Sequence, residues 1–590
     1  MYNLGVCLQF QQRYKEAYDF FYKASWNSAW QAAGFFALAQ LDMNNRDYKK
    51  AWYHIHLSLD RNAGNHKAMA IKIFSLRKMG LIDQAMKLCE EVLKKDRFNL
   101  VVYLEQNRLW RLTDDKSKSL QALEKAYKLC RGDAHNFIEY AIDYSAAGLY
   151  EEAVRWLKYF LFKNDGGAHA FILYYLAYNL DKTGDAAQAL TIFKQAAATK
   201  TGYYFPNRIE DILVLETALR YNPTDSNACY LLGCLWYDKR QYMEAIDLWK
   251  RSISIDDKLP AAHRNLGIAL FNKRDDQEKA VECFERAFAL DKNDARILME
   301  LDQLYKRMNK PAKERLEFLE QNLSQVLLRD DLYLERVALY NYLGKYEKAC
   351  KLIMDHIFHP WEGGEGKVSA QYKYSLVQIA RKQIAAGNFE EAINSLQKAQ
   401  IYPHNLGEGK LYGIQENELF YWLAVACEGS GNKKAAVEYY EKSTGGMGQP
   451  TAAVFYNDQQ PEIFFYQGMA WEKLGQPEKA SAIFKRLLAY GKTHFNDKIE
   501  IDYFAVSLPD LLIFEDDISN RNRIHCLYMM ALGYLGLKEV EMASSLFDEI
   551  VAADAMHFGA VSHAKLNLGY EKTIPGKNSL ITKTINDPTV

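Results

Sequence analysis

The residues most able to do chemistry gather in four stretches of the C-terminal half of the chain. These stretches span 355–370, 400–416, 444–461 and 489–521. They combine carboxylate, imidazole, ammonium, amide and aromatic groups, which together can bind a polyhydroxylated ligand or an extended peptide. The residues that we expect to bind a ligand or partner are His359, Trp361, Glu362, Glu365, Lys367, His404, Glu408, Lys410, Asn457, Asp458, Asp502, Tyr503, Asp510 and His525.

Two of these stretches share the sequence Gly-Glu-Gly-Lys, which places Glu365 and Glu408 at matching points. Carboxylates about 5–10 Å apart can serve glycosyl chemistry, and neighbouring helices pack about 10 Å apart, so such a pair is geometrically possible. The same carboxylates can instead pair with lysines or cap the next helix, and so fix the loops. Both interpretations stay open. Because nothing in the sequence sets their pKa, we expect a chain that is not an enzyme.

Metal, cofactor and nucleotide sites are not expected. Four histidines occur late in the chain, at His494, His525, His557 and His563, but their spacing matches no zinc signature. The nine cysteines include no Cys-x-x-Cys pair. The Gly-Lys-Thr at 491–493 lacks the preceding glycines that a phosphate-binding loop needs. The sequence therefore predicts a protein without a metal or cofactor.

Charge and hydropathy narrow the range of partners. The 590 residues carry 74 basic and 75 acidic side chains, a balance that argues against nucleic-acid binding. Charged residues interrupt every apolar stretch before it reaches the ~20 residues that cross a bilayer. The first residues show no secretion signal, and scattered cysteines are typical of reduced thiols in a reducing compartment. We expect a cytoplasmic protein that binds neither nucleic acid nor a membrane.

A repeated frame predicts the elements that position the loops. A small residue, usually alanine, precedes a bulky apolar residue by four positions, and the pattern first recurs every 34 residues, as from Ala17 to Ala51. Such offsets place both residues on one helix face. Many anchors follow a glycine by five positions, as Ala85 follows Gly80, and a positive φ at that glycine reverses the chain. The fourteen anchors are Ala17, Ala51, Ala85, Ser119, Ala153, Ala189, Ala245, Ala280, Arg315, Ala349, Ala392, Ala436, Ala480 and Ala543.

This frame resembles the tetratricopeptide repeat. The stretches CYLLGCLWYDKRQYMEAIDLWKRSISID and HRNLGIALFNKRDDQEKAVECFERAFALDKNDA are close to that family's pattern, including its terminal proline at Pro223. The resemblance implies an all-α fold of about 14 helical hairpins in a right-handed superhelix with a concave and a convex face. It also implies a non-catalytic scaffold that mediates protein–protein or protein–ligand interaction, with a protein or peptide as partner.

Two related binding modes do not fit the residues. Pentatricopeptide RNA readers have a similar repeat length but lack the Leu-Gly and alanine frame. Adaptors of the tetratricopeptide family that hold C-terminal carboxylates use an asparagine just after the packing glycine. Here that position holds Val6, Cys234 and Ile268, which argues against a carboxylate clamp.

Departures from the period predict the domain organisation. Between Ala189 and Ala245 the interval lengthens, and 207–221 reads as a second helix without its partner, so we expect a seam near 199–208. After Ala349 the intervals lengthen again because extra residues follow each second helix. We therefore expect N-terminal repeats over 1–200, middle repeats over 201–355, C-terminal repeats with long loops over 356–570 and a flexible tail over 571–590.

The C-terminal loops carry a second resemblance. HPWEGGEGK, NLGEGKL, YNDQQP, DYFAVSLPDLLIFEDD and HCLYMMALGYLGL look like a bacterial family of large tetratricopeptide proteins of unassigned function. In that family a mutarotase-like β-sandwich region precedes the repeats, which implies the alternative function of a carbohydrate-binding or accessory module in a sugar-processing protein. This sequence departs from the family by lacking the β-sandwich. Because Met1 already falls inside the first repeat, we expect a longer parent chain.

Overall fold

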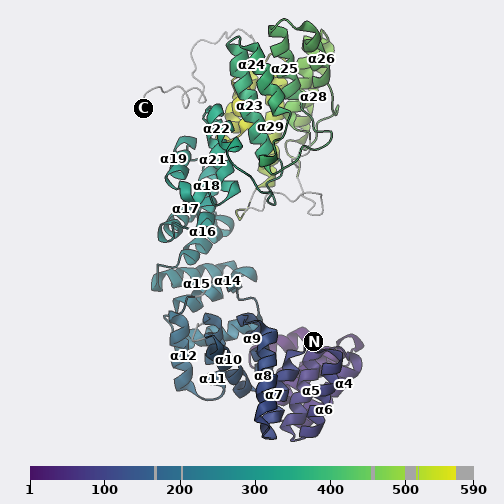
Figure 1. Cartoon of the computed structure of the whole chain (residues 1–590), viewed down its shortest axis with the longest axis vertical. Helices are drawn as coiled ribbons and strands as arrows, with labels where there is room; N and C mark the ends of the chain where they lie inside the picture. Colours follow the sequence, from purple (N-terminus) through teal and green to yellow (C-terminus); the bar gives the residue numbers. More distant parts are fainter. Residues whose placement is uncertain (165–168, 201–203, 453–458, 499–512, 516, 567–590) are drawn as a thin grey trace. The chain divides into compact units, whose positions relative to one another are not determined.

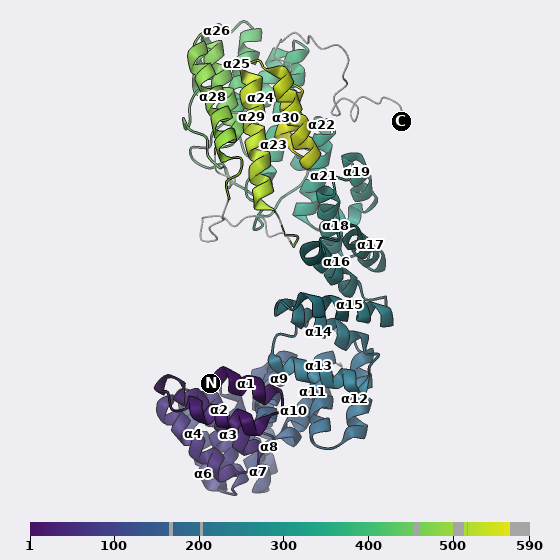
Figure 2. The same ribbon diagram turned by 180° about the vertical axis from the view of Figure 1, so that it is seen from behind.

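The computed structural model describes residues 1–164, 169–200, 204–452, 459–498, 513–515 and 517–566. Over these residues the secondary structure is helical throughout, with no strand, so the predicted all-α fold class is confirmed. The chain divides into two compact units, Met1–Leu266 and Gly267–Val590, and the division falls inside one helix. Figure 1 and Figure 2 show the helices of each unit from opposite sides.

The helices of the first unit form seven hairpins and one unpaired helix. They are α1 (Tyr2–Phe10), α2 (Tyr14–Ala24), η1 (Ser28–Trp30), α3 (Gln31–Asn44), α4 (Tyr48–Arg61), α5 (His66–Lys78), α6 (Ile82–Lys95), α7 (Leu100–Leu112), α8 (Lys116–Cys130), α9 (Ala134–Ala146), α10 (Tyr150–Lys163), α11 (Ala170–Lys182), α12 (Ala186–Ala198), α13 (Ile209–Tyr221), α14 (Ser226–Asp238) and α15 (Tyr242–Ile255). The unpaired helix is α13. It covers the stretch that the sequence predicts to be a helix without its partner.

The helices of the second unit form seven more hairpins, the first of which begins at the division between the units. They are α16 (Pro260–Arg274), α17 (Gln277–Leu290), α18 (Ala295–Arg307), α19 (Ala312–Gln321), α20 (Leu323–Val326), α21 (Asp330–Tyr342), α22 (Tyr346–Met354), α23 (Lys367–Ala385), α24 (Phe389–Ala399), η2 (His404–Leu406), α25 (Asn417–Gly429), α26 (Lys433–Ser443), α27 (Pro461–Lys473), α28 (Pro477–His494), α29 (Ile518–Gly536), α30 (Val540–Ala553) and α31 (Phe558–Ala564). The described residues thus contain fourteen hairpins, as predicted.

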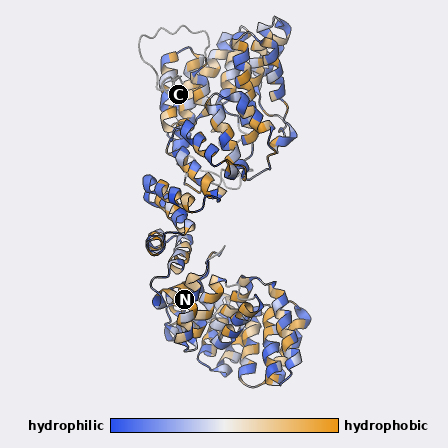
Figure 3. Ribbon diagram, turned by 60° about the vertical axis from the view of Figure 1, so that its left-hand side comes forward, coloured by the Kyte–Doolittle hydropathy of each residue, from blue (hydrophilic) through white to orange (hydrophobic). Residues whose placement is uncertain are grey.

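The predicted frame explains how each hairpin packs. All fourteen anchors lie on second helices and are buried. The first helix of the hairpin packs closely against the second. At Gly233, for example, an added Cβ would lie 2.6 Å from the Trp249 ring nitrogen. In Figure 3 hydrophobic and hydrophilic residues alternate around the helices, as expected for hairpins that bury one face of each helix.

The turn inside each hairpin uses a residue with positive φ. Seven of the fourteen turns place glycine there, as the sequence predicts. The other seven force an ordinary residue into the left-handed region, which costs about 1 kcal/mol each. Those seven residues are Gln12, Arg46, Asp114, Arg240, Asp275, Asn309 and Lys538. The turn geometry is therefore fixed by the hairpin, whether or not the sequence supplies a glycine.

The inner helices of the first unit are joined by a buried ionic network. Arg77 on α5 donates to Glu105 on α7 at 2.6 Å and to Glu152 on α10 at 3.2 Å. The Tyr144 hydroxyl donates to the same Glu105 at 3.0 Å, and the Tyr144 ring stacks on Phe74. Side chains of successive first helices therefore contact one another directly in this unit.

The long inter-repeat segments of the second unit follow second helices, as predicted. The loops joining α22 to α23, α24 to α25 and α26 to α27 correspond to the first three predicted stretches, although part of the third lies outside the described residues. The first helices also lengthen, since α23 and α29 each have 19 residues. The first helices α25 and α27 keep 13 residues each, so the added length lies in first helices only at α23 and α29. The predicted boundaries at 200 and 355 fall inside the two units and stay a prediction.

Candidate functional site

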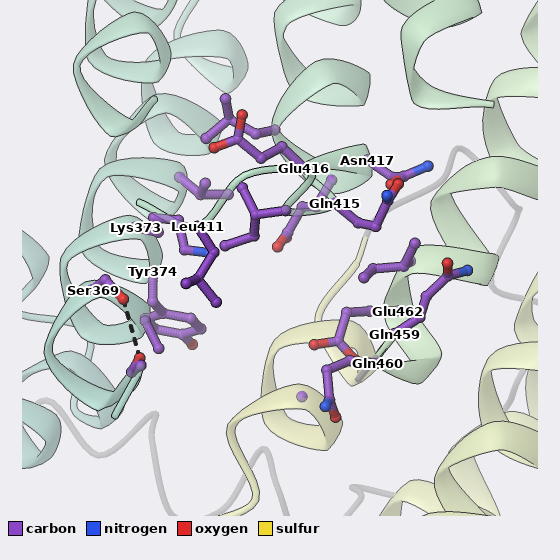
Figure 4. Close-up of a pocket in the computed structure, with 18 of the residues that line it drawn as sticks. Ser369, Lys373, Tyr374, Leu411, Gln415, Glu416, Asn417, Gln459, Gln460 and Glu462 are labelled. Carbon is purple, nitrogen blue, oxygen red and sulfur yellow. Dashed lines mark hydrogen bonds between the residues drawn. The ribbon is translucent and has the colours of Figure 1, made fainter. Parts of the chain in front are cut away.

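A cavity of about 720 Å³ lies among helices of the second unit. Its walls come from the first half of α23, the loop that leads into α25, the start of α27 and the short helix α31. In Figure 4, Lys373, Tyr374 and Leu411 lie on one side of the open space, and Gln459 and Glu462 lie on the other. Three consecutive hairpins thus contribute their first helices to one hollow.

Helix α31 closes one side of the cavity by packing against the first helices. The Phe558 ring lies 5.0 Å from the Tyr374 ring, centroid to centroid. The Ser562 hydroxyl accepts hydrogen bonds from Arg381 at 2.9 Å and from Gln378 at 3.1 Å. These contacts join residues of α31 to residues of α23, which are far apart in the sequence. The cavity therefore depends on α31 lying against α23.

Two carboxylates face the cavity from neighbouring hairpins. Glu418 lies near the start of α25 and Glu462 near the start of α27, and both are half-buried. Glu418 accepts a hydrogen bond from the Tyr466 hydroxyl at 3.1 Å. Burial raises the pKa of Glu418, although the Arg381 charge opposes the shift. Burial also raises the pKa of Glu462 to about 7, and the neighbouring Glu418 charge contributes to that rise.

His563 on α31 adds a neutral nitrogen acceptor. Its side chain is buried, and burial lowers its pKa to about 3, so the ring stays uncharged at neutral pH. Nδ1 lies 2.8 Å from the Gly559 carbonyl oxygen, a contact that requires the proton on Nδ1 because two acceptors would repel. Nε2 then carries a lone pair, and it has no hydrogen-bond partner among the described residues. His563 lines the cavity, and its Nε2 atom is itself buried from solvent.

Other polar groups in the wall are committed to the loops. Asn417 Nδ2 donates to the carbonyl oxygens of Ser443 and Gly445 at 2.6 and 2.7 Å. Gln459 Oε1 accepts from the Met447 amide at 2.8 Å. These amides hold the loop between α26 and α27 in place. Glu418, Glu462, Lys373 and the Tyr402 hydroxyl, which has no hydrogen-bond partner among the described residues, also line the cavity.

The rim of the cavity is apolar and exposed. Leu411 and Met447 are 46% and 49% exposed, and Tyr412 is fully exposed. All three line the same cavity. Aromatic residues and methionine are enriched where proteins bind one another, because they supply large contact area in adaptable shapes. The site thus combines a polar interior with an apolar entrance.

The predicted residue Glu408 lies in the cavity wall, where it caps a helix. Its carboxylate accepts hydrogen bonds from the backbone amides of Gly366 at 2.7 Å and Ser369 at 2.6 Å, at the start of α23. Negative charge is favourable at a helix N-terminus, where these amides lack partners. Glu365, its match in the repeated Gly-Glu-Gly-Lys, is exposed. The structure therefore does not bring Glu365 into the cavity with Glu408.

The remaining predicted residues of the first two loops lie outside the cavity. His359 is exposed, with Nδ1 3.1 Å from Asp330, and Lys410 forms an ion pair with Glu416 at 2.7 Å. The Trp361 ring folds over Gly364 in its own loop, where a Cβ on that glycine would lie 2.2 Å from it. Residues that are simply exposed are Glu362, Lys367 and His404. Whether these side chains bind anything stays a prediction.

Predicted residues of the last two loops fall in two groups. His525 on α29 lies 3.1 Å from the Thr451 carbonyl through Nε2, and it lines a smaller cavity of about 280 Å³ that also includes Glu462. Burial lowers the pKa of His525 below its usual value. The other predicted residues, Asn457, Asp458, Asp502, Tyr503 and Asp510, lie outside the described residues.

Four side chains at equivalent positions line the two cavities, and the sequence prediction included only the last of them, His525. Tyr374, Glu418, Glu462 and His525 each lie 18 positions before the anchor of their hairpin, so they occupy equivalent sites on four successive first helices. All four line one or the other cavity, and Glu462 lines both. The constant offset was visible in the sequence. The sequence prediction rested on the loops after the second helices, and these positions lie on the first helices instead.

Comparison with known proteins identifies tetratricopeptide repeats in this part of the chain. The family's models match residues 418–445 and 462–490. Each match begins at one of the two cavity carboxylates, so Glu418 and Glu462 hold the same place in two recognised repeats.

Three solved structures that match the chain have low sequence identities and low TM-scores. The chain is 20% identical to MamA residues 41 to the end from Desulfovibrio magneticus RS-1, over 33% of this chain and 97% of that one, with a TM-score of 0.20. It is 18% identical to YrrB, described as a TPR protein with an unusual peptide-binding site, over 36% and 95%, with a TM-score of 0.17. The Cut9–Hcn1 hetero-tetramer of APC/C matches at 13% identity over 96% and 95%, with a TM-score of 0.23.

Within the described ranges, no helix is both long and apolar enough to cross a bilayer. In the same part of the chain, no three His, Cys, Asp or Glu side chains lie close enough together to share a metal ion.

Proposed function

We propose that this chain is a non-catalytic tetratricopeptide scaffold that holds a peptide segment of a protein partner in the cavity between α23, α25, α27 and α31. The observation that carries the proposal is the row formed by Tyr374, Glu418, Glu462 and His525 on four successive first helices. A row of equivalent positions on stacked hairpins offers one contact per repeat to an extended ligand.

The dimensions of the row suit a peptide. Neighbouring helices pack about 8–10 Å apart, and an extended peptide advances about 3.3 Å per residue, so every third peptide residue would meet a new hairpin. The cavity volume of about 720 Å³ has room for a few residues. The exposed Leu411, Tyr412 and Met447 at the rim add the apolar contact that anchors a protein partner.

A carbohydrate ligand remains the alternative, and the geometry supports it less. Sugar recognition depends on amide and carboxylate groups with an aromatic stacking face. Here the amides of Asn417 and Gln459 are committed to the loops, and Trp361 lies on its own loop. We also propose a cytoplasmic location, supported by nine cysteines for which the structure shows no disulfide among the described residues.

A cavity-blocking substitution tests the proposal. Ala370 is exposed and lines the cavity on α23, so Ala370→Trp should fill the space without disturbing the core. Ala385 is exposed near the other end of the same helix and does not line the cavity, which makes Ala385→Trp a matched control. The full chain and both variants are applied to a bead library of random acetylated pentapeptides and to a glycan array.

We expect pentapeptides to be retained by the wild type and by Ala385→Trp, but not by Ala370→Trp. Glycan binding that Ala370→Trp abolishes, without peptide retention, would support the carbohydrate alternative instead. Peptide retention that is equal in all three proteins would place binding elsewhere on the chain and contradict the proposal.

A further inference from the structure

We infer that the cavity recognises a lysine or arginine side chain of the bound peptide, held by Glu462 and Glu418. This inference rests on the proposed function and goes beyond it by naming what the site selects. It follows from the hydrogen-bonding character of the wall, from the positions of the nearby cations and from the spacing of the acceptors.

The carboxylates of the wall have few donors. Among the described residues the Glu462 side chain forms no hydrogen bond and no ion pair with another side chain, and only its own backbone amide acts on it as a donor. Glu418 has the Tyr466 hydroxyl and the Trp422 side chain as neutral donors. A buried acceptor with few donors is costly, so a ligand with several N–H groups would be favoured here.

The neighbouring protein cations are engaged elsewhere. Arg381 lies over the Trp422 ring, 5.2 Å from its centroid, and donates to Gln378 and Ser562. The Lys373 ammonium lies 6.0 Å from the centroid of the Tyr402 ring. Both charges act on the carboxylates through space, but neither forms an ion pair with Glu462 or Glu418 among the described residues. The carboxylates therefore remain available to a cation from outside.

The spacing of the acceptors favours an organic cation over a metal ion. Within the described residues, no three side chains of metal-binding type lie close enough to share one ion. An ammonium or guanidinium group is larger and carries several N–H donors that point in different directions. Val377, Ile414 and Ile463 line the same cavity, and such apolar groups can cover the alkyl stem of lysine or arginine.

The protonation of Glu462 supports the same conclusion. Because burial and the Glu418 charge raise its pKa to about 7, a proton occupies this carboxylate in about half of the unbound molecules at neutral pH. A lysine or arginine side chain would replace that proton with a permanent positive charge and provide the donors that the pair lacks.

Sequencing of the retained library peptides tests the inference. In the wild-type chain we expect lysine and arginine to be enriched about tenfold over glutamine at one position. Glu462→Gln keeps the shape of the side chain but removes its charge, so it should abolish the enrichment while peptides are still retained. Glu418→Gln should weaken the enrichment, and Glu365→Gln, an exposed carboxylate outside the cavity, should leave it unchanged.

The outcomes separate this inference from the proposed function. Retention that Ala370→Trp abolishes, with no preference for lysine or arginine, would overturn the inference and keep the peptide site. An enrichment that survives both Glu462→Gln and Glu418→Gln would also overturn it. If no retention is sensitive to Ala370→Trp, both the site and its preference are wrong. Thermal unfolding of each variant checks that the chain is folded.

Discussion

Replacing Arg315 by methionine should destabilise the region around α18, α19 and α21. Arg315 takes the anchor position that alanine occupies in most hairpins, and its side chain is fully buried. The guanidinium donates to Asp302 through Nε at 3.1 Å and through Nη2 at 2.7 Å, and Nη2 also donates to Glu335 at 2.8 Å. One arginine therefore neutralises two carboxylates from neighbouring hairpins.

The expected loss of stability follows from the buried carboxylate that Arg315→Met leaves without its charge partner. Methionine fills a similar volume, so the main loss is the charge partner of the buried Asp302. Burial raises the pKa of that carboxyl and Arg315 opposes the rise, so Asp302 loses its main stabilising charge. Glu335 keeps Lys306 at 3.2 Å. Breaking one partner of a buried pair costs about 3–5 kcal/mol, and the retained lysine places the expected loss near 3 kcal/mol.

Hydrogen exchange measured by mass spectrometry on the full chain is the suitable assay, because it reports local opening free energies in each helix. The control is the double variant Arg315→Met with Asp302→Leu, which removes the orphaned carboxylate and should recover at least half of the lost protection. A single variant that loses less than about 1 kcal/mol, or a double variant no more stable than the single, would refute this reasoning.

Four further changes test other parts of the account. Gly233→Ala places a methyl group 2.6 Å from the Trp249 ring nitrogen and should cost about 1–3 kcal/mol in urea unfolding. Arg240→Gly relieves a turn residue with a φ of 61° and should add about 1 kcal/mol in the same assay. Glu408→Ala removes two hydrogen bonds from the start of α23 and should lower exchange protection there by about 1–2 kcal/mol. Retention of lysine-containing peptides should rise about tenfold from pH 6 to pH 8, because the Glu462 carboxyl ionises with a pKa of about 7.

The pH prediction has a definite sign. The native pKa of Glu462 lies above its ordinary value of 4.5, so the folded chain holds this proton more tightly than the unfolded chain does. Its contribution to the unfolding free energy is therefore largest below pH 4.5 and is lost as the pH rises through 7. A bound lysine offsets that loss. The groups that act on this carboxyl are Glu418 and Lys373.

Each of these four predictions would be contradicted by a specific result. If Gly233→Ala has no effect on stability, the two helices of this hairpin are not closely packed. If Arg240→Gly lowers stability, the turn residue is not strained. Unchanged protection in Glu408→Ala would show that its hydrogen bonds do not hold α23. A flat pH profile in the wild type, or the same rise in Glu462→Gln, would remove Glu462 from the binding step.

The hairpin architecture could be predicted from the sequence because its causes are local. Each anchor packs within its own hairpin, and the turn residue lies five positions before it, so Ala280 and Asp275 can be placed without knowing the rest of the fold. The positive φ at turns without glycine could be placed in the same way. Arg315 departs from that pattern in part, because its partner Asp302 lies on the same hairpin but its partner Glu335 lies on the next one.

The candidate site was harder to predict because its causes are not local. Glu408 was predicted to bind a ligand or partner, which stays a prediction, and its contacts in the structure are to the backbone at the start of α23. The cavity also needs α31 to lie against α23, through contacts such as Ser562 with Arg381. The pKa of Glu462 depends on that burial and on Glu418 from another hairpin. No periodicity in the sequence reports such contacts.

Site-specific cross-linking tests the central claim most directly, that the cavity holds the peptide. A benzoylphenylalanine placed at Tyr412, which is fully exposed at the rim, is compared with one at Val437, which is 47% exposed on α26 and outside the cavity. The probe is the biotinylated pentapeptide most enriched by the wild-type chain. We expect biotin transfer at position 412 and none at 437, and Ala370→Trp should abolish it. Equal transfer at both positions, or transfer at 437 alone, would contradict the account.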